Sequence, residues 1–530
     1  MRSPTLIRRR AMPQDPPASL GRRRLAVAGW AGGALVLFAF LYRISLDWAF
    51  SSDWANISLQ SWDMLHGQLL LHGWILSDAA FYTFEVPLGA IAEAVLGLSG
   101  VTAHVIPALT YLIVVVLAVA LAVSDSRGAA RAVRAGVVVA VMVAVPSQSG
   151  VFDLLQQADH TGTSAFLLGS FLLIDRFPGR RFTAPLLCVI LCAGQVGDAT
   201  VRYTAVPAII VVCAYRVLAA RRLRTPDTAI AIAAALSYPL ATLVREAMRR
   251  LGGYVMLPPR NHLSPPHEWP GHLWIALNNT RHLFGAYSDG QSLLGGVGIA
   301  LGVICLIAAG FGFSRVIWSW RTASRAEQLL CAVIVATVVV YVLSTIPNLG
   351  NRRDIVAVLP CGAVLAARAC VPGRIVAGRR AALAVAAAAV AVLLPLTAAA
   401  ARPVAPAEGA TLATWLEAHH LTYGIAAYWD ASDVTYDSDN RVQVRAVISN
   451  GTRFFPYYWE TKAPWYSAAQ HDATFAIADI PPNVDVRSTV ADFERYFGQP
   501  AETYRVGAQV VLVYRKNLLK QVAVTSPPRS

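Results

Sequence analysis

The sequence predicts a polytopic α-helical membrane protein that ends in a small soluble region. Three observations lead to this fold class. Of the 530 residues, 56% are hydrophobic and only 14% are charged, which is a composition typical of membrane proteins. Long apolar runs recur through the first 400 residues. Arginines gather in every second segment between those runs, as expected for loops on the cytoplasmic side of a membrane.

The apolar runs give the expected number of membrane spans. A helix needs about 20 mostly apolar residues to cross the hydrocarbon core of a bilayer. Eleven segments approach this length, and we expect eleven spans, give or take about two. They are residues 25–44, 103–124, 132–147, 162–174, 183–197, 203–220, 228–246, 291–314, 328–346, 354–371 and 380–400.

The arginines orient these spans. If the N-terminus is cytoplasmic, the inner segments hold 24 arginines and no lysine; these segments are residues 1–24, 125–134, 175–182, 216–227, 315–327 and 368–380. This distribution agrees with the positive-inside rule and with an odd number of spans. We therefore expect a multi-pass membrane protein with a cytoplasmic N-terminus and its C-terminus outside. The formal net charge of +14 then reflects topology and contact with anionic lipid, and no nucleic-acid partner is expected.

The chain divides into three parts. Residues 1–24 are interpreted as a disordered basic cytoplasmic tail, followed by a retained first span and not by a cleaved signal peptide. Residues 25–400 form the expected membrane domain, with long outer loops at 45–102 and 247–290. Residues 401–530 have the composition of a soluble extracytoplasmic domain.

Both outer loops are expected to be ordered. Apolar positions in 54–66 follow a helical spacing, which predicts an interfacial helix lying along the membrane. The nearby tryptophans are interpreted as anchors at the membrane boundary; they are Trp48, Trp54, Trp62 and Trp74. The loop at 247–290 carries five prolines and four histidines, which favour an extended or semi-rigid lid over a helix.

Alternating patterns after residue 408 predict a small α/β or α+β fold. The expected helices are 409–419 and 489–498, and the expected strands lie in 423–432, 441–448, 473–480, 502–506 and 508–516. No residue pattern in this part assigns it a role.

Acidic residues are few and collect on the outer side. A carboxylate near lipid is costly unless it is paired or faces a water-filled cavity, so each is a candidate functional residue. Asp53 is the strongest candidate because it directly follows the first span. Its alternative role is that of a helix N-cap, since two serines precede it. The other outer acids are Asp47, Asp63, Asp78, Glu85, Glu93, Asp153, Asp159 and Asp198.

Two adjacent arginines provide the opposite charge. Arg352 and Arg353 lie just outside the tenth apolar run, in "PNLGNRRDIV", where planar guanidinium groups could hold a phosphate. They could equally be snorkelling or acid-paired arginines. Carboxylates and arginines on one side suit the use of a donor that is activated by a lipid phosphate. The carboxylate accepts a proton from the acceptor hydroxyl, and the cations steady the leaving phosphate.

Together these features resemble the GT-C class of integral membrane glycosyltransferases, which includes protein O-mannosyltransferases and the lipid A aminoarabinose transferase. The resemblance rests on "SDWANISLQSWDMLHG" followed by "FYTFEVPLGAIAEAVLGLSG". In that class the first span leads into an outer loop that opens with a catalytic Asp, continues as an amphipathic helix and reaches a Pro-Leu stretch. The specific part covers residues 51–100, and the general pattern covers 25–400.

The resemblance implies roles for residues of the first outer loop. Asp53 would be the catalytic base, and Glu85 beside "VPL" would lie near the substrate. This chain has Trp54 where the class often has a second acidic residue. A requirement for a divalent metal therefore stays open, and no cofactor is indicated.

Further along the chain, the resemblance implies four more substrate contacts. Asp159 and His160 would take the place of the acidic motif of the second outer loop. Arg352 and Arg353 would contact the donor phosphate.

The leading hypothesis is an inverting glycosyltransferase. It would move a sugar from a polyprenyl-phosphate donor to a glycan, lipid or protein on the outer face of a bacterial plasma membrane. The C-terminal region resembles those of actinobacterial membrane proteins of this kind. One alternative is a transporter or flippase, which predicts charged or broken helices at the membrane midplane and an internal repeat. The other is an inactive relative that displays the C-terminal domain as a binding module.

Overall fold

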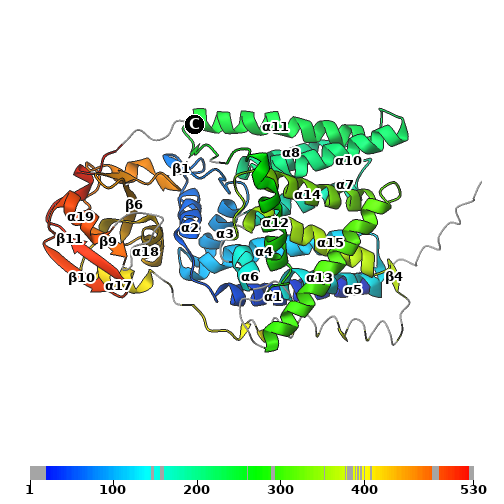
Figure 1. Ribbon diagram of the computed structural model, residues 1–530, viewed down its shortest axis with the longest axis horizontal. Helices are drawn as coiled ribbons and strands as arrows, with labels where there is room; N and C mark the ends of the chain where they lie inside the picture. The colour runs from blue at the N-terminus through cyan, green and yellow to red at the C-terminus, as the bar shows by residue number, and fades with distance from the viewer. Residues whose placement is uncertain are drawn as a thin grey trace, which may run out of the picture.

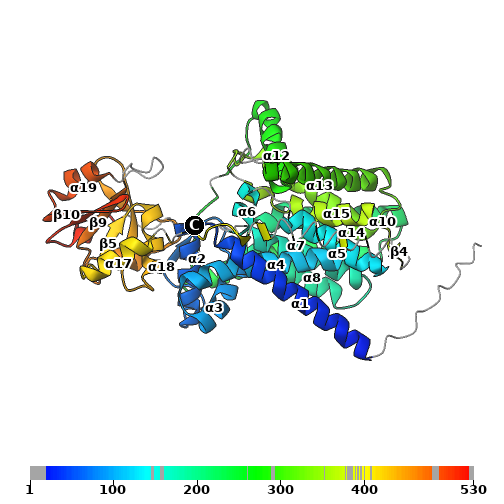
Figure 2. The ribbon, with the colours of Figure 1, turned by 90° about the horizontal axis from the view of Figure 1, so that it is seen from below.

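The computed structural model describes residues 20–144, 148–155, 160–259, 261–287, 293–350, 352–375, 409–479 and 489–524, with scattered residues between 376 and 408. A bundle of helices and a C-terminal α/β region lie at opposite ends of the molecule (Figure 1). Two shorter helices, α2 (Ser52–Leu65) and α3 (Glu85–Leu96), lie between them, as the second view also shows (Figure 2). Most of the expected tail 1–24 and of the expected span 380–400 lies outside the described residues.

Long apolar helices build much of the bundle, and the protein is a polytopic membrane protein. Among the described residues, six helical stretches are long and apolar enough to cross a membrane. They belong to α1 (Leu20–Ser45), α4 (Gly100–Ala122), α9 with α10 (Thr200–Tyr203, Ala205–Ala220), α11 (Pro226–Arg250), α13 (Leu293–Trp318) and α14 (Arg325–Leu343). Each coincides with an expected span.

Four other expected spans are shorter helices. They are α5 (Ala129–Val139), continued by a π-helical turn at Ala140–Ala144, α7 (Thr161–Arg176), α8 (Thr183–Gly197) and α15 (Val358–Cys370). For α15 the reason is that neighbouring helices cover it. All residues of α15 from Val358 to Arg368 are buried, and this helix packs against α4, α5, α13 and α14. The last helices of the bundle are α6 (Gln148–Leu155) and α12 (Trp269–Leu283).

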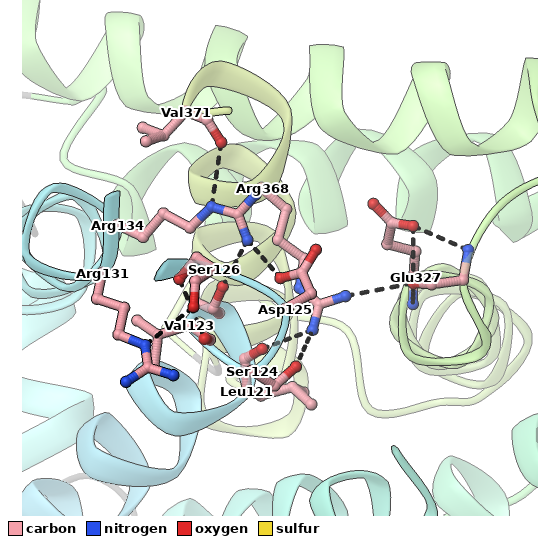
Figure 3. Close-up of polar contacts among 12 residues, drawn as sticks. Leu121, Val123, Ser124, Asp125, Ser126, Arg131, Arg134, Glu327, Arg368 and Val371 are labelled. Carbon is pink, nitrogen blue, oxygen red and sulfur yellow. Dashed lines mark hydrogen bonds and ion pairs between the residues drawn. The ribbon is translucent and has the colours of Figure 1, made fainter. Parts of the chain in front are cut away.

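Two buried arginines from the arginine-rich segments make polar contacts with neighbouring parts of the chain (Figure 3). Arg134 donates to the carbonyls of Val371 at 3.1 Å and Ala122 at 2.9 Å. Arg368 donates to the carbonyl of Leu121 at 2.6 Å. These carbonyls lie at helix C-terminal ends, which lack partners within the helix and attract positive charge. At least these two arginines therefore hold helices together and do not face lipid.

A small sheet ties the outer segments to each other. Its central strand β1 (Trp74–Leu76) pairs in parallel with β3 (Val255–Met256) and antiparallel with β8 (Thr461–Lys462). These strands come from the first outer loop, the second outer loop and the C-terminal region. A second short pairing joins β2 (Arg127–Gly128) and β4 (Arg374–Ile375) at the opposite end of the bundle.

The helix expected at 54–66 is present as α2, but its packing differs from the expectation. Trp54 is 1% exposed and donates its indole hydrogen to the carbonyl of Ala103 at 2.7 Å. Trp74 is also 1% exposed, and its indole donates to Asp63 Oδ2 at 2.6 Å. The interpretation of these two tryptophans as membrane anchors is therefore wrong, because both belong to the protein core.

Helix α3 has the exposed apolar surface that α2 lacks. Ile91, Val95 and Leu96 are 67%, 80% and 44% exposed, as expected for a helix that rests on a membrane. The second outer loop also differs from the expectation, because α12 occupies part of it. Pro270 lies at the start of α12, where proline is favoured and missing its N–H costs nothing.

The C-terminal region contains a mixed six-stranded sheet with the order β10-β11-β9-β5-β6-β7. The strands are β5 (Tyr423–Ala426), β6 (Gln443–Ser449), β7 (Phe454–Pro456), β9 (Phe475–Asp479), β10 (Glu502–Val506) and β11 (Gln509–Val513). The helices are α17 (Ala410–Ala418), α18 (Ser432–Asp437) and α19 (Val490–Phe497). Each strand and helix expected from the sequence pattern has a counterpart here. Of these helices, α18 packs against α2.

Candidate active site

Asp53 lies in the first turn of α2. Ser51 takes the N-cap position with an extended backbone, φ −97° and ψ 168°, and the helix begins at Ser52. The alternative role of Asp53 as the N-cap is therefore wrong. Its carboxylate lies where the positive end of the helix dipole favours a negative charge.

The residues on either side of Asp53 hold this turn in place. Ser52 Oγ donates to the carbonyl of Trp429 at 3.1 Å, and Trp54 bonds to Ala103 on α4. The C-terminal region and the helical bundle therefore clamp the start of α2 from two directions.

The carboxylate of Asp53 is half-buried and contacts the C-terminal region directly. The Tyr428 hydroxyl donates to Asp53 Oδ1, and Asn56 Nδ2 donates to the Tyr428 oxygen at 3.3 Å. Burial raises the pKa of Asp53 above its usual range. The hydrogen bond from Tyr428, the charge of Arg353 and a hydrogen bond from Trp459 oppose this rise. A carboxylate under these opposing influences is suited to general base catalysis.

A cavity of about 720 Å³ lies beside this group, which is within the usual range for ligand sites. Arg353 and Trp459 both line it and both act on Asp53. Asp53 itself is not among the lining residues, and its connection to the cavity is through Arg353 and Trp459. The lining residues are Asp78, Ala79, His160, Asp198, Ala199, Thr200, Tyr203, Thr204, Pro259, Asn261, His262, Leu263, Thr337, Val340, Tyr341, Leu343, Ser344, Thr345, Ile346, Asn348, Arg353, Asp354 and Trp459.

His160 lies in the cavity wall between two carboxylates. It precedes α7 in a left-handed conformation with φ 61°. Its Nδ1 lies 2.7 Å from Asp198 Oδ2, and its Nε2 lies 3.5 Å from Asp354 Oδ1. Both carboxylates belong to the cavity lining. The imidazole is therefore fixed in orientation from both of its nitrogens.

Asp198 is held as a carboxylate in the same wall. It accepts hydrogen bonds from the Thr163 hydroxyl and from the backbone N–H of Thr200, the latter at 2.8 Å. Burial alone would raise its pKa, but the charge of His160 and the hydrogen bonds from His160, Thr163 and Thr200 lower it to about 2. Asp198 therefore stays ionised and anchors His160.

The two arginines expected to contact a phosphate have different surroundings. Arg352 forms an ion pair with Asp153 and also donates to the carbonyl of Leu349 at 3.1 Å. Arg352 does not line the cavity, whereas Arg353 does. The acid-paired alternative thus describes Arg352, and Arg353 keeps the expected position for a substrate contact.

Glu85 does not line the cavity either. Its side chain is 3% exposed, and its Oε1 accepts a hydrogen bond at 3.0 Å from the N–H of Gly162. A Cβ atom at Gly162 would lie 2.1 Å from that oxygen, so only glycine fits there. Glu85 thereby holds the first turn of α7, next to His160. Asp159, the other expected acid, lies outside the described residues.

Several site residues were not assigned a role from the sequence. For three of them the sequence does hold a signal. Asp78 and Asp198 belong to the outer acids, and Asp354 directly follows Arg352 and Arg353. Tyr428 and Trp459 gave no such signal, because they lie in a region whose pattern carries no recognisable motif.

The protein also has a smaller apolar pocket of about 320 Å³. Its lining residues are Pro207, Ala208, Val211, Ile317, Trp320, Cys331, Ala332, Val335, Ala336 and Val339. These residues lie on α10, α13 and α14 and in the turn that follows α13.

No protein-family model matches this chain, and no curated protein matches it. It is similar to the crystal structure of ArnT from Cupriavidus metallidurans in the apo state, with a TM-score of 0.56 and 12% sequence identity. The match covers 95% of this chain and 100% of that chain. The chain has the GT-C fold.

The GT-C likeness includes the C-terminal region, because the match extends over nearly the whole chain. A second and weaker likeness is to the Archaeoglobus fulgidus oligosaccharyltransferase tethered with an acceptor peptide. Its TM-score is 0.45 at 13% identity, and the match covers 84% of this chain and 69% of that chain.

Within this GT-C fold, the described residues contain no group of three or more His, Cys, Asp or Glu side chains arranged to hold a metal ion. The requirement for a divalent metal that the sequence left open therefore stays open.

Proposed function

We propose that this protein is a membrane glycosyltransferase that moves a sugar from a polyprenyl-phosphate donor to an acceptor on the outer side of a bacterial plasma membrane. One observation carries the proposal. Asp53 and Arg353, which lie 300 positions apart in the sequence, act on each other, and Arg353 lines one large cavity. The GT-C fold supports the same assignment.

An apolar pocket and a polar cavity are both present, and a lipid-linked donor has an apolar and a polar part. The apolar pocket between α10 and α14 would hold the isoprenoid chain, and the polar cavity would hold the phosphate and the sugar. Arg353 is the proposed phosphate contact because a guanidinium offers several donors to phosphate oxygens. His160 supplies, when protonated, a second positive group on this side.

In the proposed reaction, Asp53 accepts the proton of an acceptor hydroxyl. The acceptor oxygen forms a bond to the anomeric carbon on the side opposite the phosphate. The bond between that carbon and the phosphate oxygen breaks, and its electron pair leaves with polyprenyl phosphate. Arg353 stabilises the charge of the departing phosphate. The sugar is transferred with inversion at its anomeric carbon.

The test uses hydrolysis of the donor, in which water replaces the unknown acceptor. Purified protein is incubated with decaprenyl phosphate carrying radiolabelled mannose, arabinose, glucose or galactose, and the release of free sugar is measured. Wild type is expected to release sugar from at least one donor. Asp53→Asn keeps the side-chain shape but removes the base, so release is expected to fall by about a hundredfold or more.

Asp63→Asn is the matched control on the same helix. Asp63 accepts from Trp74 and pairs with Lys462 at 2.7 Å, and it does not line the cavity. It is expected to retain sugar release. Release by Asp53→Asn at the wild-type rate would exclude Asp53 as the base, and no release by wild type from any of these donors would contradict this choice of substrate.

A further inference from the structure

The contact between the C-terminal region and α2 is centred on Asp53. Ser52 Oγ bonds to the Trp429 carbonyl at 3.1 Å and lies 3.4 Å from Asp433 Oδ1. Tyr428 donates to Asp53, the next residue along α2. The C-terminal region therefore reaches the carboxylate itself, and not only the surface of the helix that carries it.

The Tyr428 side chain is held in one orientation by its neighbours. It is 3% exposed and lies in a 3-10 turn, Tyr428–Asp430, that follows β5 after one buried residue. Its ring packs edge-on against Trp429 and Tyr457, with centroids 5.0 Å and 5.1 Å away. Asn56 donates to its oxygen at 3.3 Å, so the hydroxyl hydrogen is left to point at Asp53.

Few groups act on the Asp53 carboxylate. Hydrogen bonds from Tyr428 and Trp459 come from the C-terminal region, and the charge of Arg353 comes from the segment before α15. Two further acids of the C-terminal region lie close by. Asp433 lies beside Ser52, and Glu460 influences Tyr428. On the other sides of α2, helices α3 and α4 carry Glu85, Glu93 and His104.

We propose that Tyr428 is a positioning residue for Asp53, so that the C-terminal region is a working part of the active site and not a separate appendage. This inference rests on the proposed role of Asp53 as the base. A hydrogen bond to one carboxylate oxygen fixes the rotation of the group about its side-chain bond. It also favours the ionised form that can accept a proton.

The test variant is Tyr428→Phe, which keeps the packed ring and removes the hydroxyl. Loss of the donated hydrogen bond leaves burial less opposed, so the pKa of Asp53 is expected to rise. Sugar release at neutral pH is expected to fall about tenfold. The acidic limb of its pH profile is expected to move to higher pH.

A second readout follows Asp53 without turnover. A carbodiimide reacts with protonated carboxyl groups, and labelling of Asp53 is measured by mass spectrometry across a pH series. The midpoint of labelling in Tyr428→Phe is expected to lie at higher pH than in wild type. This measurement remains informative even for a protein that turns over no available donor.

Tyr436→Phe is the matched control. Tyr436 lies in α18 at the same contact, and its hydroxyl donates to the carbonyl of Ser99 at 2.5 Å, without touching Asp53. It is expected to leave both the pH profile and the labelling midpoint unchanged. An equal shift in both variants would mean that loosening of the contact, and not the Tyr428 hydroxyl, is responsible, and would overturn the proposal.

Unchanged midpoints in Tyr428→Phe would also overturn it. That result would not decide whether Asp53 is the base, because Asp53→Asn tests this role directly. Loss of sugar release in Asp53→Asn with no change in Tyr428→Phe would leave the proposed function intact and remove only the role of Tyr428.

Discussion

Two adjacent arginines of identical chemistry have different surroundings in this protein. Arg352 neutralises Asp153, whose side chain is 2% exposed. Arg353 lines the cavity and acts on Asp53. An arginine that balances a buried charge contributes to stability, and one that faces a cavity contributes to binding.

Substitution of each arginine by glutamine is expected to separate these roles. Arg352→Gln leaves the charge of Asp153 buried and without its arginine, and is expected to lower the free energy of unfolding by about 3 kcal/mol. Arg353→Gln is expected to leave the unfolding midpoint nearly unchanged and to lower kcat/KM for donor hydrolysis. Thermal unfolding and the hydrolysis assay, applied to both variants, check this. The reverse pattern would show that the assignments are exchanged.

Glu93 is a buried acid with a different character. It is 2% exposed, and neither carboxyl oxygen has a hydrogen-bond partner among the described residues. Burial raises its pKa to about 9. It is therefore neutral in the folded protein at pH 7, whereas in the unfolded chain it is ionised above its usual value of 4.5.

This difference predicts how stability depends on pH. Because the folded state binds the extra proton between pH 4.5 and about 9, the free energy of unfolding is expected to fall as pH rises through this window. Glu93→Gln removes the titration, so at pH 7 it is expected to be more stable than wild type by roughly 3 kcal/mol. Thermal unfolding at pH 5 and pH 8 checks this. Parallel curves for the two proteins would mean that Glu93 is ionised when folded.

Among the elements, α2 was predicted in place and length but not in packing. Its spacing of apolar residues is the same whether the apolar face meets lipid or protein, so periodicity cannot separate the two. The structure buries Trp54 against α4, and α3 carries the exposed apolar face. The difference arises because the outer segments and the C-terminal region cover α2.

Trp54→Ala is therefore expected to destabilise the protein by about 3–5 kcal/mol, as for other large buried side chains. The control is Trp318→Ala, because Trp318 is 90% exposed and its loss is expected to cost no more than about 0.5 kcal/mol. Unfolding midpoints in detergent measure both. Equal, small effects would mean that Trp54 rests on lipid after all.

At the scale of the whole molecule, hydropathy predicted the long spans because lipid-facing helices must be both long and apolar. Hydropathy predicts α15 less clearly, because this helix is only 13 residues long and protein surrounds it. The position of Asp53 could be predicted from its place after the first span. The contact with Tyr428 could not, because the two residues lie 375 positions apart and meet only through folding of the C-terminal region.

The alternative functions differ in the reaction that the whole molecule would carry out. A flippase would move a lipid without breaking a covalent bond, and an inactive relative would bind without turnover. Neither would release sugar from a polyprenyl-phosphate donor, and neither would depend on the charge of one carboxylate beside the cavity.

The most direct test of the central claim is the rate of sugar release by Asp53→Asn relative to Asp63→Asn, measured on purified, folded proteins with the same donor. We predict near wild-type release by Asp63→Asn and a loss of about a hundredfold or more in Asp53→Asn. Equal rates in the two variants would contradict the assignment of Asp53 as the base and, with it, the proposed mechanism.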